Sequence, residues 1–208
     1  MYGEVKTLIN INPANPQERL LIKAADILKK GGVIAYPTDT IYGIGCDIYN
    51  KKALEKIYLM KGRDKRKPMS FVCSDLSHIS RFARVSNSAY RIMKRCLPGP
   101  YTFILEASSE VPKMLMNKRK TVGIRIPDNE ITLQLVKHLG NPIISTSANI
   151  TGEDVISDPV EIELFLGKFL DATIDAGVLA GDPSTIIDLT DNVPSLIREG
   201  AGDYSWLK

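Results

Sequence analysis

Cationic side chains crowd the stretch KGRDKRKP, which runs from Lys61 to Pro68 and follows a segment with the apolar spacing of a helix. Within it Lys61 and Arg63 flank Gly62, and Lys67 lies near its end. Arg grips phosphate oxygens through two parallel N–H donors, whereas Lys acts as a point charge. The stretch could therefore bind a small polyanion or a nucleic acid, with a solvated loop as the plain alternative.

A second polar group, TDTIYGIG (38–45), comes directly after the apolar segment VIAYP. Thr40 and its two preceding residues offer hydroxyl groups and a carboxylate, and Gly43 and Gly45 would let backbone approach a ligand closely. Ligands of open α/β sheets favour the crevices beyond strand ends. A capped turn explains the same residues equally well.

STSANITG (145–152) repeats this arrangement after the apolar segment NPII. Ser147 and Asn149 could donate hydrogen bonds to phosphate or help to hold a metal ion, and an Asx or Ser turn before a helix is the alternative. Arg125 interrupts a third apolar segment, TVGIRIP, where an unpaired guanidinium would be costly to bury. We expect Arg125 to lie at an open strand end or against an anion, unless it faces solvent from an edge strand.

The composition is that of an ordinary globular protein. The 208 residues are 44% hydrophobic and 25% charged, with a formal net charge of +3, which allows an anionic partner without requiring one. The length is most simply that of one domain, 1–208.

Cys46, Cys73 and Cys96 are scattered, and His78 and His138 are the two histidines, so no spacing typical of a metal site occurs. Unpaired thiols favour a reducing compartment. The first residues lack the pattern of a signal peptide, and no apolar run approaches the roughly 20 residues that span a bilayer. These features predict a cytoplasmic protein that binds no metal through its own side chains and does not associate with a membrane.

Helices and strands are predicted to alternate along the whole chain. Asn15 is expected to cap the first helix, which Gly31 and Gly32 end. The further helices are predicted near 50–62, 75–82, 86–96, 111–116, 131–139 and 159–166. The strands are predicted at 33–38, 69–73, 101–107, 121–127, 142–146, 172–177, 184–190 and 195–200. This order predicts an α/β layered sheet that is not purely parallel.

The order of the motifs YPTDTIYGIG, KGR, PGPYTFIL, TVGIRIP, STSANITG and STIIDLT resembles the YrdC/TsaC family over nearly the whole chain. The resemblance implies an α/β fold of the α+β, YrdC-like type. In this fold a twisted mixed sheet, largely parallel, is flanked by helices and carries a positively charged concave cavity.

The resemblance also implies a reaction. The family makes L-threonylcarbamoyladenylate from L-threonine, bicarbonate and ATP and releases pyrophosphate, with Mg²⁺ held mainly by the ATP phosphates. The product feeds the threonylcarbamoyl modification of adenosine 37 in tRNA, through downstream tRNA threonylcarbamoyl-transfer proteins.

Motif by motif, the resemblance assigns roles to individual residues. The residues implied for catalysis are Lys61, Arg63, Ser147 and Asn149. Those implied for nucleotide binding are Arg63, Lys67, Thr121, Ser147 and Arg198. Those implied for threonine binding are Thr40, Arg125, Ser145 and Ser184.

The sequence also departs from the family pattern. Lys67 replaces the usual Asn, and Val72 stands where a threonine-associated His is expected. The phrases KPMSFVCSDL, KRKTVGIRIP and LIREGAGD are closer to the YciO-like branch. Two alternatives therefore stay open: a YciO-like protein that binds tRNA or double-stranded RNA without efficient threonine turnover, and a carbamoyl-transfer enzyme with another acceptor.

The cationic stretch generates the first testable prediction. Arg63→Ala should weaken ATP binding by roughly 1.5–3 kcal/mol, the range for a hydrogen bond to a charged group. Arg66→Ala, in the same stretch but outside the K-x-R element, is the control and should lose less. Equal losses of ATP affinity in a calorimetric titration would show that the stretch acts only as diffuse charge.

Overall fold

A computed structural model describes residues 8–62, 69–116, 118–191 and 193–207. The cationic stretch beyond Gly62, with Arg63 and Lys67, lies outside the described residues. The helices are α1 (Glu18–Lys29), α2 (Lys51–Lys61), α3 (Leu76–Phe82), α4 (Asn87–Cys96), α5 (Glu130–Leu139), α6 (Pro159–Leu166) and the short 3-10 turns Lys113–Leu115, Gly167–Phe169 and Ser205–Leu207. The strands are β1 (Leu8–Asn10), β2 (Ile34–Tyr36), β3 (Gly43–Asp47), β4 (Ser70–Val72), β5 (Ala83–Arg84), β6 (Tyr101–Ala107), β7 (Thr121–Arg125), β8 (Ile143–Ser147), β9 (Ala172–Asp175), β10 (Thr185–Asp188) and β11 (Ser195–Arg198).

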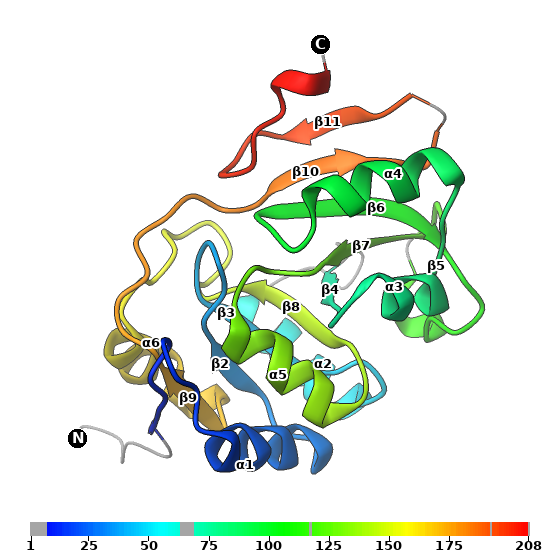
Figure 1. Cartoon of the computed structure of the whole chain (residues 1–208). Helices are drawn as coiled ribbons and strands as arrows, with labels where there is room; N and C mark the ends of the chain where they lie inside the picture. The colour runs from blue at the N-terminus through cyan, green and yellow to red at the C-terminus, as the bar shows by residue number, and fades with distance from the viewer. Residues whose placement is uncertain (1–7, 63–68, 117, 192, 208) are drawn as a thin grey trace.

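The strands form one sheet in the order β1-β9-β2-β3-β8-β4-β7-β6-β10-β11, with β5 paired to β6. Figure 1 shows β9 and β2 near α1 at one end of the molecule and β10 and β11 at the other. The expected mixed sheet flanked by helices is thus confirmed.

The proportion of parallel strands differs from the expectation. β1–β9, β9–β2, β4–β7 and β6–β10 are parallel, and the other pairings of the described strands are antiparallel. The expected largely parallel sheet is therefore wrong. β3 follows β2 after a short connection, which permits only an antiparallel neighbour, and β8 then inserts antiparallel between β3 and β4.

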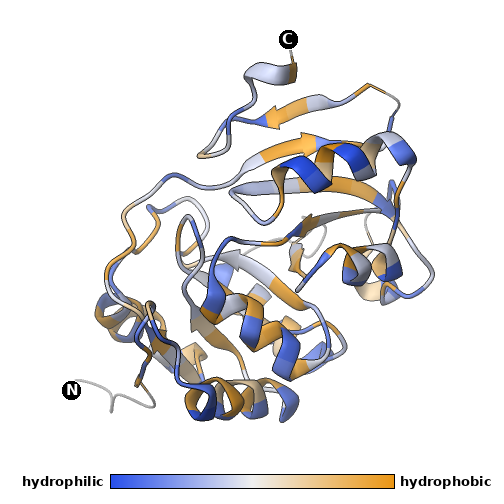
Figure 2. Cartoon of the chain, in the orientation of Figure 1, coloured by the Kyte–Doolittle hydropathy of each residue, from blue (hydrophilic) through white to orange (hydrophobic). Residues whose placement is uncertain are grey.

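Two apolar clusters cover the sheet. The larger one packs α2, α3, α4 and α6 against residues such as Phe71, Phe103 and Ile144. The smaller one packs α1 and α5 against Tyr36, Val72 and Ile143. In Figure 2 the helices alternate between hydrophilic and hydrophobic residues, and several strands carry hydrophobic stretches.

The smaller cluster covers only part of its face. It includes residues of β1, β9, β2, β8 and β4 but none of β7, β6 or β10. Side chains alternate along a strand, so Ser70 faces the same way as Val72, and Ser145 the same way as Ile143. Polar side chains therefore begin on this face where the apolar cluster ends.

Two local predictions were wrong. Gln17, not Asn15, is the N-cap of α1, and no side chain caps the helix there. The segment GIG, which was not among the predicted strands, forms the buried strand β3. Its glycines make room for neighbours: a Cβ on Gly45 would come within 2.3 Å of the Ile144 carbonyl oxygen.

Among the described helices, none is long and apolar enough to cross a membrane.

The glycines of β3 generate a prediction about stability. Gly45→Ala should lower the free energy of unfolding by at least roughly 1–3 kcal/mol, because the new methyl group would meet backbone that cannot easily move. Gly43→Ala is the matched control. Its Cβ would lie 3.0–3.2 Å from side-chain atoms of Tyr36 and Ser145, so it should cost less. Urea unfolding of both variants measures the difference, and an equal or reversed order would contradict the packing described.

Candidate functional site

A cavity of about 220 Å³ opens on the half-covered face of the sheet. Hydroxyl groups and two guanidinium groups supply most of its polar lining. The polar residues that line it are Thr38, Tyr42, Ser70, Thr102, Arg125, Ser145, Thr146, Ser147, Ser184 and Arg198. No carboxylate belongs to this lining within the described part of the chain, so the cavity suits an anion.

Arg125, the last residue of β7, is only 7% exposed. Its Nη2 donates to Asp39 Oδ1 at 2.5 Å and to Thr40 Oγ1 at 2.9 Å. The other carboxylate oxygen of Asp39 accepts from the Asp128 backbone N–H at 3.1 Å. A buried guanidinium needs such a partner, and Asp39 supplies it. Arg125 therefore lies against an anionic group, the Asp39 carboxylate, which is one of the arrangements that the sequence predicted.

Arg198, on β11, contributes the second guanidinium. Its Nη2 donates to the Ser184 carbonyl oxygen at 2.6 Å, and the Ser184 hydroxyl lies 2.8 Å from that of Thr102. Burial lowers the pKa of Arg198, and the nearby charge of Arg125 lowers it further. Two cations that repel each other across a cavity are stabilised by an anion placed between them.

Ser145, on β8, accepts a hydrogen bond of 2.6 Å from the phenol of Tyr36. Tyr36 is fully buried, and this burial raises the pKa of its phenol to about 12. Ser147, two residues further along β8, donates instead to Asn149 Oδ1 at 2.7 Å.

Lys61 holds the turn that follows β8. Its Nζ donates to the carbonyl oxygens of Ser147 (3.0 Å) and Asn149 (2.6 Å) and to Asn149 Oδ1 (2.6 Å), and the residue is 2% exposed. The Asn149 amide in turn donates to the Glu153 carbonyl oxygen. The Lys of the K-x-R element and the S-x-N element are therefore in direct contact, although 86 residues separate Lys61 from Ser147.

The structure brings most of the expected site residues together. Arg125, Ser145, Ser147, Ser184 and Arg198 line the cavity. Thr40 and Asn149 contact residues of that lining, and Lys61 contacts Ser147 and Asn149.

Two expectations find no place in the cavity. Thr121 begins β7, four residues before Arg125, and is not part of the described lining. Val72 lies beside Arg125 in the register of β4 and β7, but it is fully buried in the apolar cluster under α1 and α5. An imidazole at position 72 would have to enter that cluster.

Sequence reasoning missed the partners that hold the site residues. Asp39 was expected only to offer a carboxylate, and Tyr36 appeared only as part of a buried strand. The signal for Tyr36 was the pair of glycines at 43 and 45, since glycine in a strand often marks close approach of a neighbouring group.

Metal-binding side chains do not gather in the described ranges: no group of three or more His, Cys, Asp or Glu lies close enough to hold an ion.

Comparison with known proteins finds a family model, a sequence relative and a solved structure that belong to the same family. The family model for Sua5, YciO and YrdC, described as "Telomere recombination", matches residues 26–200. YciO of Escherichia coli K12 is 46% identical over 195 residues, covering 93% of this chain and 95% of YciO. The crystal structure of E. coli YciO has a TM-score of 0.92 at 44% identity and covers 96% of this chain and 98% of that one.

More distant relatives carry a named activity. A threonylcarbamoyl-AMP synthase of Pyrococcus abyssi is 33% identical over 196 residues, covering 93% of this chain and 57% of the relative. The crystal structure of P. abyssi Sua5 complexed with L-threonine has a TM-score of 0.86 at 32% identity and covers 93% of this chain and 57% of that chain.

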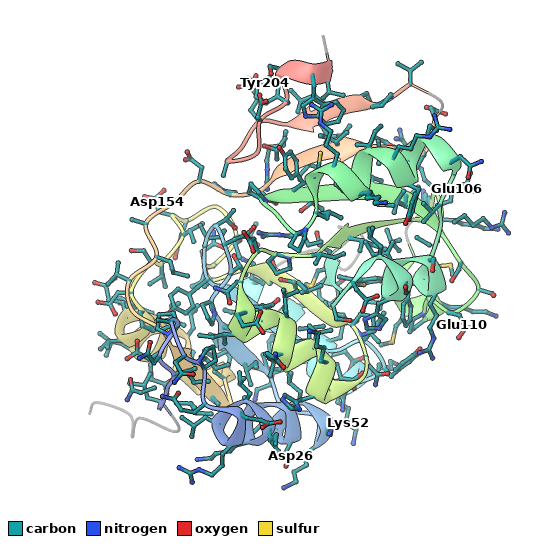
Figure 3. All side chains as sticks on the ribbon, viewed as in Figure 1. Asp26, Lys52, Glu106, Glu110, Asp154 and Tyr204 are labelled. Carbon is teal, nitrogen blue, oxygen red and sulfur yellow. The ribbon has the colours of Figure 1, made fainter. Side chains whose placement is uncertain are left out.

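The Asp39–Arg125 pair generates a prediction about stability. Asp39→Ala should lower the free energy of unfolding by about 3–5 kcal/mol, because it leaves the Arg125 charge buried without its counter-ion. Asp26→Ala is the control: its pair with Lys29 lies on the exposed side of α1, and Asp26 projects outward (Figure 3), so it should cost less than about 1 kcal/mol. Chemical unfolding at neutral pH measures both, and similar losses would contradict the role given to Asp39.

Proposed function

This chain belongs to the Sua5/YciO/YrdC family, and we propose that it is a nucleotidyltransferase of the threonylcarbamoyl-AMP synthase type. It would join L-threonine, bicarbonate and ATP into threonylcarbamoyl-AMP and release pyrophosphate. The observation that carries the proposal is the cavity itself, in which two guanidinium groups and a ring of hydroxyls face a space without a carboxylate in its described lining.

The carboxylate of L-threonine would bind beside Arg125. Asp39 and Thr40 occupy only the Nη2 group of Arg125 with hydrogen bonds, and they fix the direction of the guanidinium. Ser145 and Ser184 supply hydroxyls close to that position. P. abyssi Sua5, which was crystallised with L-threonine, supports this assignment at the level of the family.

The phosphates of ATP would lie toward Arg198, beside the turn that carries Ser147 and Asn149. Ser147 would accept a hydrogen bond from the nucleotide there, because its own hydrogen is given to Asn149 Oδ1. Lys61 would act mainly by holding the turn that presents Ser147 and Asn149, since its amino group already contacts three oxygens of that turn. Contacts of Arg63, Lys67 and Thr121 with the nucleotide stay predictions.

The reaction combines two anions, so charge compensation is the main task of the site. The amino nitrogen of L-threonine would first bond to the carbon of bicarbonate, with loss of water, to give a carbamate. A carbamate oxygen would then attack the α-phosphorus of ATP, and the bond from that phosphorus to the oxygen of pyrophosphate would break. Arg125 and Arg198 would offset the repulsion between the reactants, and the held hydroxyls would orient them. The cavity offers hydroxyls rather than carboxylates, which fits an Mg²⁺ ion that enters with ATP and is held mainly by its phosphates.

We further propose that the product serves the threonylcarbamoyl modification of adenosine 37 in tRNA in the cytoplasm, with downstream threonylcarbamoyl-transfer proteins as partners. Binding of tRNA or double-stranded RNA without threonine turnover, or carbamoyl transfer to another acceptor, would be the outcome if the amino acid proves not to be a substrate.

The proposal predicts that pyrophosphate is released only when ATP, Mg²⁺, bicarbonate and L-threonine are all present. Pyrophosphate release is measured in the complete mixture and with each component left out in turn. Unchanged turnover without L-threonine or without bicarbonate would reject the reaction. An ATP analogue with a methylene bridge between the α- and β-phosphorus is the control and should be inert, because the bond that must break is replaced.

A further inference from the structure

Tyr36 is a buried polar group that the proposed mechanism does not use. Its side chain is fully buried, and its phenol donates to Ser145 Oγ at 2.6 Å. Ser145 lines the cavity, whereas Tyr36 lies behind it. The two residues are 109 positions apart in the sequence, and β3 separates β2, which carries Tyr36, from β8, which carries Ser145.

The strand between them leaves room for this contact. Gly43 of β3 is the cross-strand partner of Tyr36 on one side and of Ser147 on the other. A Cβ on Gly43 would lie 3.1 Å from the Tyr36 oxygen and 3.2 Å from Ser145 Oγ. A Cβ on Gly45 would lie 3.1 Å from the Tyr36 ring. The two glycines let the ring cross β3 and reach the next strand.

The hydrogen bond fixes the direction of the Ser145 hydroxyl. A buried phenol that donates to nothing would cost free energy, so Tyr36 keeps its hydrogen on Ser145 Oγ. Ser145 is then the acceptor in this contact, and its own hydrogen is left for a different oxygen. Ser147 is the opposite case, because its hydrogen is already given to Asn149 Oδ1.

We propose that Tyr36 is a positioning residue that orients the Ser145 hydroxyl hydrogen into the cavity, where it is donated to an anionic oxygen of the bound substrate. The identity of that substrate as L-threonine rests on the proposed function. The direction of the hydroxyl rests on the contacts of Tyr36 alone. Burial raises the pKa of Tyr36, whereas the hydrogen bond with Ser145 and the charge of Arg125 lower it, so the oriented hydroxyl and the guanidinium belong to one region.

The test is a calorimetric titration of L-threonine into the full chain and the variants Tyr36→Phe, Ser145→Ala and the double variant. Tyr36→Phe should weaken binding about two- to tenfold, as expected for one neutral hydrogen bond. Ser145→Ala should weaken it at least as much, and the double variant should bind like Ser145→Ala alone, because Tyr36 acts only through Ser145. Binding of ATP should change little in Tyr36→Phe.

Tyr101→Phe is the matched control. It removes a phenol that donates to the Asp203 carbonyl oxygen, outside the described cavity lining, and should leave threonine binding unchanged. A Tyr36→Phe variant that binds threonine like the unmodified chain, or losses that add in the double variant, would overturn the inference. If Tyr36→Phe does not fold, Ser145→Ala and Ser145→Thr still decide, because only the latter keeps a donor; equal affinities would refute the role of the hydroxyl.

The outcome separates this inference from the proposed function. If the unmodified chain makes threonylcarbamoyl-AMP but Tyr36→Phe has no effect, the function stands and the role of Tyr36 is wrong. If the chain does not bind L-threonine, bicarbonate replaces it as the anionic probe. Weaker bicarbonate binding in Tyr36→Phe, again without further loss in the double variant, would support the role of Tyr36 while the threonine reaction fails. A chain that binds neither probe contradicts both.

Discussion

The burial of one guanidinium governs the arrangement of the site. Arg125 ends a strand inside an otherwise apolar part of the sheet and is 7% exposed. Its counter-ion, Asp39, follows β2, and three strands, β3, β8 and β4, separate β2 from β7 in the sheet order. The chain after β2 must therefore cross the strand ends to reach Arg125. Thr132, in the first turn of α5, binds the Pro37 carbonyl oxygen and holds this crossing segment in place.

The cavity exists because the helices on that face are too few to cover the sheet. α1 and α5 bury Val72 on β4 and Ile143 on β8, but the neighbouring positions on the same face are Ser70 and Ser145. A shift of two residues along either strand thus changes an apolar core position into a polar lining position. The same short strands build the core and the site, so the site is held by rigid elements rather than by loops alone.

The sequence predicted the helices and strands better than it predicted the contacts between distant parts of the chain. Apolar periodicity placed most of the described helices and strands, because the burial of each side chain is visible in its own residue type. It missed β1 and β5, which are only three and two residues long. It also missed β3, since glycine disfavours strands unless a neighbour fills its place, and here that neighbour is the ring of Tyr36. The expected site residues came from motif order. The contacts that hold them, Asp39 with Arg125 and Lys61 with Asn149, join distant parts of the chain and leave no local pattern.

The interior position of Lys61 changes the meaning of the cationic stretch. A charge run is normally a solvated surface, yet its first member is 2% exposed and bound to the turn after β8. Lys61 and Tyr36 are both buried, and each contacts the polar segment that begins at Ser145: Tyr36 at Ser145 and Lys61 at Ser147 and Asn149. Through Tyr36, Ser145 presents a hydrogen, and through Asn149, Ser147 presents an oxygen. Two serines of the same strand thus differ in what they can bind, although nothing in their sequence distinguishes them.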